Sequence, residues 1–123
     1  MKKTRYEDLS KYDVYTVLQE KLSLSEMLVL NWVATNLEEG NQEKIEVYGK
    51  DYYIINLVAI HKEINEFKQL TAVVDRYTIY LKKLAEKGYI SIARGTYMSG
   101  KYGYCKLAVR MENKYKKILN KGE

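Results

Sequence analysis

The segment GTYMSGK, residues 95–101, has two glycines and a lysine at the spacing of a phosphate-binding loop. In such a loop, backbone amides and the lysine surround a phosphate at the N-terminus of the helix that follows. Here Tyr102 stands where a magnesium-binding Ser or Thr is required, and the next residues alternate with a period of two, which predicts a strand. We therefore expect no nucleotide site. The tip of a hairpin is instead the expected place of Gly95, Gly100 and Gly103.

Residues that commonly catalyse reactions or bind metals are scarce. The chain has one histidine, His61, and one cysteine, Cys105, which excludes a disulfide within the chain and a cysteine-based zinc site. The adjacent acids Glu38 and Glu39 come just before a glycine at a predicted helix end, where exposure to solvent is expected rather than a catalytic acid and base. We predict a protein that is not an enzyme and that uses no cofactor, metal or small-molecule substrate.

Charge is unevenly distributed along the chain. Residues 1–66 have eight basic and twelve acidic side chains, a net charge of −4, whereas residues 67–123 have thirteen and four, a net charge of +9. The sequence between Lys87 and Met111 contains no acid. Such a basic half favours nucleic acid or an acidic membrane surface as a partner, and a solvated basic face without a partner is the alternative.

The sequence predicts one domain in the cytoplasm without a membrane partner. No apolar run approaches the roughly 20 residues that span a bilayer. The lysines at positions 2 and 3 are not followed by the apolar core of a signal peptide. Repeats, low-complexity segments and linkers rich in Pro, Gly or Ser are also missing from the 123 residues.

Two helices are predicted in the first third of the chain. Ser10 caps a leading helix that runs to about residue 21, with one apolar face formed by Tyr15, Leu18 and Leu22. Ser23 and Glu26 form a capping-box pattern for a second helix over 24–39, which ends at a glycine. This second helix is apolar nearly all round, so we expect the leading helix or a second subunit to cover it.

A strand region and a third helix follow. Ile45 and Val47 alternate with polar residues before YYII, residues 52–55, which is typical of a short hairpin or of a single strand. Asn56 then caps a helix whose apolar residues repeat at helical spacing: Leu57, Ile60 and Ile64. His61 lies in this helix, where we expect a structural or exposed histidine.

The strongest element signals come late in the chain. Thr71 caps the helix AVVDRYTIYLKKLAEK, which ends at Gly88 with lysines near its negative end. A helical wheel predicts that one face of this helix points toward the core, formed by Val74, Tyr77, Leu81, Leu84 and Ala85. The segments YISIAR and YCKLAVR then alternate with a period of two and predict a hairpin whose connection is residues 95–103.

This order of elements is that of a winged helix-turn-helix domain. In particular, YLKKLAEKGYISI resembles the Leu-x-x-Leu-x-x-x-Gly-[Tyr/Leu]-Ile junction of winged-helix regulators and of small phage and plasmid replication or partition proteins. The resemblance implies an α+β fold with a three-helix core, a two-stranded β wing and extra terminal helices. Its parts would be an N-terminal helical extension (1–22), the winged domain (23–110) and a C-terminal basic helix or tail (111–123), with the helix at about 112–121. The segment NEFKQL makes the turn before the third helix longer than usual, which leaves the docking angle of that helix open.

The resemblance also implies a homodimer that binds double-stranded DNA with a sequence preference, for partition, replication or transcription control in a phage or plasmid. Read in this way, Arg76 would contact a guanine edge, and Ala72 or Ile79 a thymine methyl group. Basic residues farther along would bind phosphates. The predicted DNA-binding residues are Thr71, Ala72, Asp75, Arg76, Ile79, Tyr80, Lys83, Lys87, Arg94, Tyr97, Lys101 and Tyr102.

Other interpretations of the same residues stay open. Arg76 and Lys83 are also explained as ordinary solvated charges, and Ile79 as a dimer contact, since the third helix takes part in dimerisation in the partition adaptors. A winged-helix module that binds protein rather than DNA is the alternative function, with contacts from Tyr97, Met98 and Tyr102 on the wing and from the Ile79/Tyr80 patch. For a homodimer, the helix over 24–39 and the leading helix are the predicted dimer surface. A filament-forming or replication protein would be a further partner.

Overall fold

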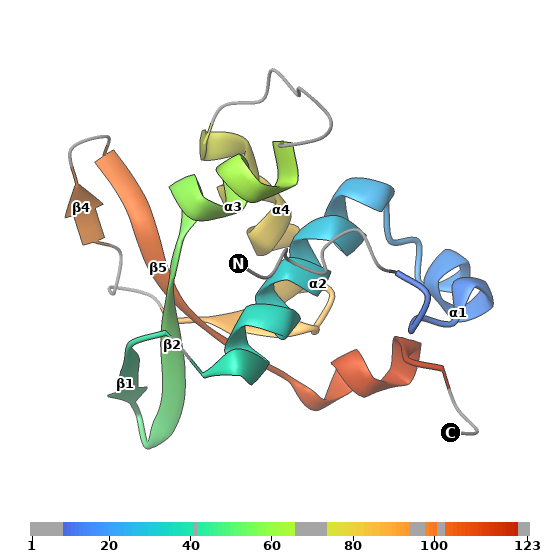
Figure 1. Cartoon of the computed structure of the whole chain (residues 1–123). Coiled ribbons are helices and arrows are strands. Elements are labelled where there is room, and N and C mark those ends of the chain that lie inside the picture. The colour runs from blue at the N-terminus through green and yellow to red at the C-terminus, as the bar shows by residue number, and fades with distance from the viewer. Residues whose placement is uncertain (1–8, 41, 66–73, 94–97, 101–102, 121–123) are drawn as a thin grey trace.

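The computed structural model describes residues 9–40, 42–65, 74–93, 98–100 and 103–120, and of residues 65, 74–76, 98–100 and 103–105 only the backbone is described. It is a mixed α+β fold with a small antiparallel sheet and several helices (Figure 1). The elements are α1 (Val14–Gln19), α2 (Leu24–Glu39), β1 (Lys44–Val47), β2 (Lys50–Asn56), α3 (Leu57–Asn65), α4 (Val74–Glu86), β3 (Ile90–Ile92), β4 (Met98–Gly100), β5 (Gly103–Met111) and the 3-10 helix η1 (Asn113–Ile118). Within the described ranges, no helix is long and apolar enough to cross a membrane.

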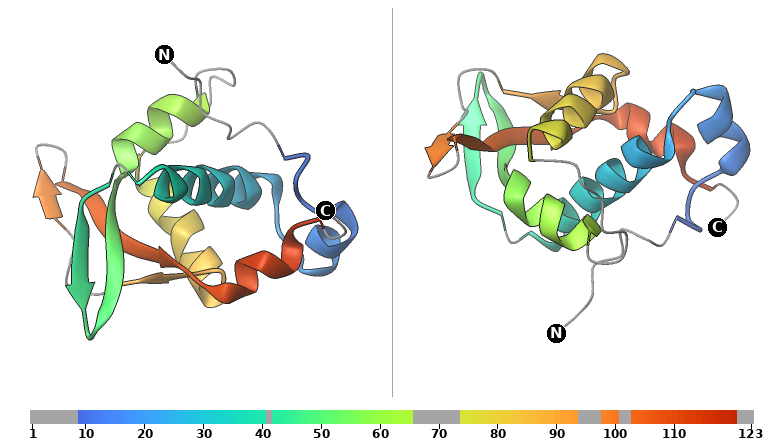
Figure 2. Two further views of the ribbon diagram at one scale, coloured as in Figure 1. Left: turned by 60° about the horizontal axis from the view of Figure 1, so that its bottom comes forward. Right: turned by 90° about the horizontal axis from the view of Figure 1, so that it is seen from above.

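Helix α2 begins and ends as the sequence predicts. The side chain of Ser23 accepts a hydrogen bond from the Glu26 N–H, and the Glu26 carboxylate accepts one from the Ser23 N–H, at 3.1 and 3.0 Å. Gly40 ends the helix with a φ of 74°. Residues 26–35 are all buried in a core shared with α3, α4, β5 and η1, and Figure 2 shows α2 among them. The cover therefore comes from the same chain, and the prediction of α2 as a dimer surface is wrong for these ten residues, because no apolar face is left over.

The sheet has the strand order β1-β2-β5-β3, and β4 also pairs with β5. All pairs are antiparallel. Of the two sequence alternatives for residues 44–56, the hairpin is confirmed. Its turn residues, Tyr48 and Gly49, have φ angles of 52° and 77°, as a two-residue turn matched to the strand twist requires.

Strand β5 is central and carries the two faces that its period predicts. Leu107 and Val109 are buried in the main core, and Ala108 is buried in a second cluster on the other face of the sheet. Ile92 pairs with Val109, which confirms the hairpin of the two late strands. The predicted connection over 95–103 is partly wrong, because the backbone of Met98–Gly100 pairs with the beginning of β5 and forms β4.

The first and last described segments pair with each other. Tyr12 and Leu119 form an isolated β-bridge, and the Asp13 N–H donates to the Ile118 carbonyl at 2.8 Å. The leading helix therefore begins at Val14 rather than near residue 10, because the residues before it are held in this extended pairing. The predicted closing helix is the 3-10 helix η1, shorter than the range 112–121.

A buried polar network joins these segments to the central helix. The Tyr12 hydroxyl donates to Asn31 Oδ1 of α2 at 2.7 Å and lies 2.7 Å from the Tyr115 hydroxyl of η1. All three side chains are buried. Burial raises the pKa of the Tyr12 hydroxyl far above its ordinary value, so it stays protonated. The network satisfies polar groups inside the core and fixes both terminal segments against α2.

The end of α1 has a capping motif without a glycine. The Leu22 N–H donates to the Val17 carbonyl and the Lys21 N–H to the Leu18 carbonyl, the two bonds of a Schellman motif. Lys21 has a φ of 59°, in the left-handed region where glycine is usual. The chain turns sharply here, so Leu22 is buried while Tyr15 and Leu18 are exposed. The prediction that these three residues form one apolar face of the leading helix is wrong, because Leu22 lies beyond the end of the helix and packs in the core.

Glu20 ties the end of α1 to the C-terminal part of the chain. Its carboxylate accepts hydrogen bonds from Lys117 Nζ at 2.9 Å and from the Tyr89 hydroxyl at 3.0 Å, and Lys114 Nζ lies 3.5 Å away. The hydrogen bond from Lys117, followed by that from Tyr89, lowers the pKa of Glu20 from its ordinary 4.5 to about 2.

Replacing Glu20 by Gln is expected to lower the melting temperature near neutral pH and to matter less in acid. Because the folded pKa of about 2 lies below the ordinary 4.5, the carboxylate stabilises the fold fully above 4.5. This stabilisation is lost as the pH falls through the folded pKa. Melting temperatures of wild type and variant, measured from pH 7 down to about pH 3, should therefore converge. A difference that stays constant over this range would contradict the assigned role, and Glu46→Gln, an exposed acid of β1, is the control.

Helix α3 begins directly after β2. The Asn56 side chain accepts hydrogen bonds from the Val58 and Ala59 N–H groups at 2.8 and 3.3 Å, which confirms it as the cap. The predicted core residues of this helix are all buried: Leu57, Ile60 and Ile64. Helix α3 therefore turns its apolar face inward, and it contacts α2, α4 and β5.

Candidate nucleic-acid interface

One face of helix α4 is anchored in the core. Tyr77, Leu81 and Leu84 are buried, as the wheel predicts, and α4 contacts α2, α3 and β3. The Tyr77 ring lies edge-on to His61 of α3 and to Tyr80, with centroids 5.5 and 5.9 Å apart. Tyr80 is half-buried against the core, so its predicted outward orientation is only partly correct, because its ring packs on Tyr77.

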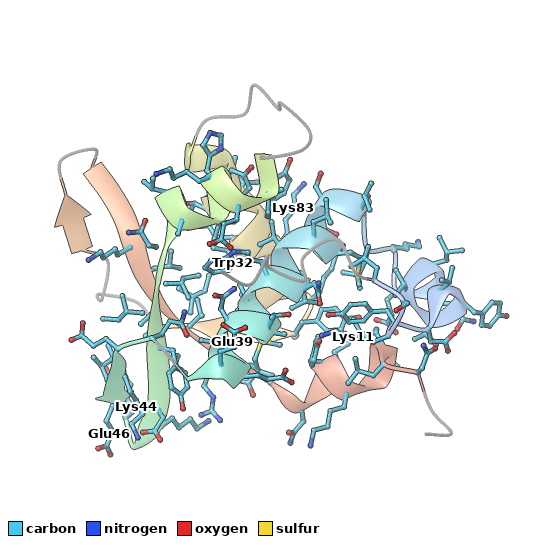
Figure 3. The ribbon with its side chains drawn as sticks, viewed as in Figure 1. Lys11, Trp32, Glu39, Lys44, Glu46 and Lys83 are labelled. Carbon is cyan, nitrogen blue, oxygen red and sulfur yellow. The ribbon has the colours of Figure 1, made fainter. Side chains whose placement is uncertain are left out.

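The opposite face of α4 is open to solvent. Its exposed side chains are Ile79, Lys82, Lys83 and Glu86. Lys83 is labelled in Figure 3, and its charge helps to lower the pKa of Glu26 at the start of α2. The described part of α4 therefore presents two lysines, one acid and an exposed isoleucine, as a solvent-facing helix surface of mixed character.

The junction from α4 to β3 has a defined geometry. Gly88 has a φ of 94°, and the N–H groups of Gly88 and Tyr89 donate to the carbonyls of Ala85 and Leu84, which is again the Schellman pattern. A Cβ at Gly88 would lie 3.2 Å from Lys114 Cδ, so a side chain would be crowded as well as strained. Tyr89 is fully buried immediately after the turn. The direction in which the chain enters β3 is thus fixed relative to α4.

Lys87, a predicted DNA-binding residue, makes contacts within the protein. Its Nζ donates to Glu26 Oε1 and to the Lys21 carbonyl, both at 2.9 Å. Burial, the largest influence, raises the pKa of Glu26, but hydrogen bonds from the Ser23 N–H and from Lys87 together hold that pKa below its ordinary value. The ammonium of Lys87 therefore compensates a buried carboxylate, and we assign it this structural role.

Much of the predicted DNA-binding set lies outside the described residues: Thr71, Ala72, Arg94, Tyr97, Lys101 and Tyr102. Asp75 and Arg76 belong to the first turn of α4, where only the backbone is described. Positions 76 and 83 are nearly two turns apart, so they share one side of α4, and Lys87 follows immediately after the helix ends. Of the predicted set, the described side chains are thus Ile79, Tyr80, Lys83 and Lys87.

Two basic residues of β5 were not included in the predicted site. Lys106 is exposed and pairs with Asn56, the residue immediately before α3. Arg110, two positions beyond the buried Ala108 on the same face, lies 6.0 Å from the ring centre of Tyr52. The period of two in β5, within a stretch without acids, is the sequence signal that places both cations on the outer face of the sheet. Figures 1 and 2 show the β4 and β5 hairpin extending beside α3 and the N-terminal end of α4.

An open pocket of about 570 Å³ lies near the end of β5 that is distant from β4. Its lining offers no histidine, cysteine or pair of acids: Leu37, Gly49, Lys50, Asp51, Tyr53, Arg110 and Met111. Among the described residues, no group of three His, Cys, Asp or Glu side chains could hold a metal ion. The pocket therefore suggests no reaction, and the surface built by α4 and the sheet remains the candidate site.

Comparison with known proteins found no matching family model, no matching curated protein and no matching solved structure.

Proposed function

We propose that this chain is a winged helix-turn-helix protein that binds double-stranded DNA as a homodimer. The observation that carries the proposal is the arrangement of α4, which is buried on one face, exposed on the other, and joined through Gly88 to strands that pair with β5. The helix order α2, α3, α4 and the neighbouring positions of β2, β5 and β3 in the sheet support the same fold. An exposed helix followed by a hairpin is the arrangement expected for a DNA-recognition helix and the wing that comes after it.

In this proposal, the N-terminal part of α4 reads the DNA sequence, and the basic residues farther along α4 and on the wing bind phosphates. The N-terminal part of α4 enters the major groove, where Arg76 contacts a guanine edge and Ile79 a thymine methyl group. The amides after Thr71 approach a phosphate. Lys83 and the wing cations Arg94 and Lys101 neutralise phosphates, which fixes the register without reading sequence. The Lys106 ammonium on β5 is a further phosphate contact on the wing side.

The charge distribution supports DNA rather than a neutral partner. The half of the chain that contains α4 and the late strands has a net charge of +9. Duplex DNA attracts such a surface at long range and releases counterions when lysines and arginines bind its phosphates. The resemblance to replication proteins, partition adaptors and repressors implies a role in one of these processes within the cytoplasm.

DNA binding is expected to be tight for a fragment from the protein's own locus and to weaken steeply with salt. We expect the affinity to fall at least roughly tenfold between about 50 and 200 mM salt, because several phosphate contacts form together. The measurement is a fluorescence anisotropy titration of purified protein at several salt concentrations, with random DNA as competitor. An affinity that does not change with salt, or equally weak binding to every fragment, would contradict the proposal and favour a module that binds protein. Repeats in a bound fragment would distinguish a centromere-like or origin-like array from a simple operator.

A further inference from the structure

Helix α1 exposes most of its apolar residues, whereas Val17 packs against the core on the inner side of the helix. Val14, Tyr15 and Leu18 are 67, 70 and 68% exposed, and none of the helix is buried. Leu24, at the start of α2 after the intervening turn, is 59% exposed. We call these four side chains the α1 surface. Isolated apolar residues on a surface are common, but a group on one short helix and the next turn is typical of an interaction site.

The exposed apolar residues of α1 belong to a helix that is firmly attached to the rest of the fold. Backbone hydrogen bonds hold both ends of α1, with Asp13 bonded to Ile118 and Leu22 to Val17. The carboxylate of Glu20 is bonded to Lys117 and Tyr89 on the inner side. Because polar contacts fix the helix, its apolar side chains are held in place before any partner arrives, and binding would cost little ordering of the backbone.

We infer that the α1 surface is the dimer interface, and that α1 packs in an antiparallel arrangement against α1 of a second copy of this chain. The inference rests on the proposed function, which requires a homodimer and leaves its interface open. A two-fold axis brings the same patch of both copies together, so Leu18 of one copy lies close to Leu18 of the other. The dimer surface predicted from the sequence included the leading helix, and the structure leaves that part exposed while α2 is buried.

The size of the surface agrees with this occupant. The four side chains expose on the order of 400 Å² per copy. Two copies would thus bury about 800 Å² in total, which is the size of a weak, reversible contact rather than of a permanent dimer.

Charges at the two ends of α1 favour the antiparallel arrangement. Asp13 lies at the N-terminal end of the helix, and the exposed Lys21 follows its C-terminal end. In an antiparallel pair, the end of α1 that carries Asp13 lies toward Lys21 of the other copy, and the two charges attract at long range, since the Asp13 carboxylate is half-buried and accepts a hydrogen bond from Thr16 Oγ1 at 2.7 Å. A parallel pair would place like charges together at each end, which disfavours it.

The position of α1 in the fold is compatible with the proposed DNA surface. Figure 1 shows α1 at one side of the molecule and the β4 and β5 hairpin at the other. A dimer formed through α1 would therefore leave the β4 and β5 hairpin of both copies uncovered. Two half-sites could then be bound at a spacing set by the dimer.

The test is the oligomeric state of Leu18→Glu, measured by analytical ultracentrifugation over a wide concentration range without DNA. Leu18 is two-thirds exposed, so the fold should persist, as far-UV circular dichroism can confirm. We expect a dimer for wild type and at least about 100-fold weaker association for the variant, because the substitution places two carboxylates at the interface. Tyr48→Glu is the matched control, since Tyr48 is 99% exposed in the β1–β2 turn and should leave the dimer intact. A monomeric wild type, or a variant that associates as strongly as wild type, would overturn the inference.

A second measurement tests the two-fold geometry directly. Leu18→Cys, in a chain whose Cys105 is replaced by Ser, should form a disulfide-linked dimer under mild oxidation, and Tyr48→Cys in the same background should not. Equal cross-linking of both variants would count against the interface. Failure of the DNA proposal gives a different result, namely a dimer that depends on Leu18 but binds all DNA weakly. Failure of the inference alone gives specific DNA binding by a dimer that Leu18→Glu leaves intact.

Discussion

Replacing Arg76 and Lys83 together by Glu is expected to weaken specific DNA binding at least about 100-fold, because each arginine or lysine contact to a base or phosphate contributes roughly 1–3 kcal/mol. The two positions share one side of α4, and the reversed charges would repel the phosphate backbone as well as removing the contacts. Anisotropy titrations with the fragment from the protein's own locus, at fixed salt, give the ratio of dissociation constants. The fold should be unchanged, since Lys83 is exposed.

The control for this variant is the double substitution Lys44→Glu and Lys50→Glu in the β1–β2 hairpin. It changes the net charge by the same amount, both side chains are exposed, and Figure 3 shows Lys44 well separated from Lys83. If the control lost as much affinity as the α4 variant, binding would be a property of the total charge. Such a result would remove α4 from the proposed interface, whereas a selective loss would support it.

Replacing Leu81 by Ala is expected to lower the free energy of unfolding by about 2–5 kcal/mol, which is the usual cost of truncating a fully buried leucine. Leu81 is fully buried on the inner face of α4, in the core that α4 shares with α2. Urea denaturation followed by far-UV circular dichroism measures the change. Loss of this contact would also loosen the helix that the proposal places on DNA, so DNA affinity should fall at temperatures near the new melting point.

Ile79→Ala provides the matched control on the same helix. Ile79 is exposed, so its truncation should change the free energy of unfolding by no more than about 0.5 kcal/mol. It should nevertheless weaken DNA binding slightly if Ile79 contacts a thymine methyl group. Equal destabilisation by the two substitutions would contradict the assignment of an inner and an outer face to α4.

The elements that could be predicted from the sequence are those whose signals are local. Ser23 and Glu26 cap the N-terminus of α2, because the side chain of each accepts a hydrogen bond from the backbone N–H of the other. Gly88 follows the end of α4, where the backbone has a positive φ that glycine adopts easily. The period of two in β5 correctly places Leu107 and Val109 in the core. Each of these features depends on residues within a few positions of one another, so a linear pattern is sufficient to find it.

The features that the sequence did not predict depend on partners that are distant in the chain. From the sequence, Lys87 is predicted to be a cation that contacts DNA. In the fold, its Nζ donates instead to Glu26 and to the Lys21 carbonyl. The end of α1 was missed because a lysine, rather than glycine, adopts the left-handed conformation there. The strand β4 was missed because its glycine and serine are typical of turns, and only its pairing with β5 makes it extended. In the candidate site, the buried and exposed faces of α4 could thus be predicted from the sequence, but the ion pair between Lys87 and Glu26 could not.

The pairing of the first and last described segments also affects the order in which the chain becomes functional during synthesis. Tyr12 and Tyr115 meet although they are 103 positions apart, and Ile118 and Lys117 hold the two ends of α1. A nascent chain can complete α2 and the β1–β2 hairpin early, but it cannot fix α1 until the residues of η1 have left the ribosome. Closing so long a loop is slow compared with forming local contacts. Neighbouring nascent chains on one messenger RNA therefore lack an ordered α1 until each copy has been completed.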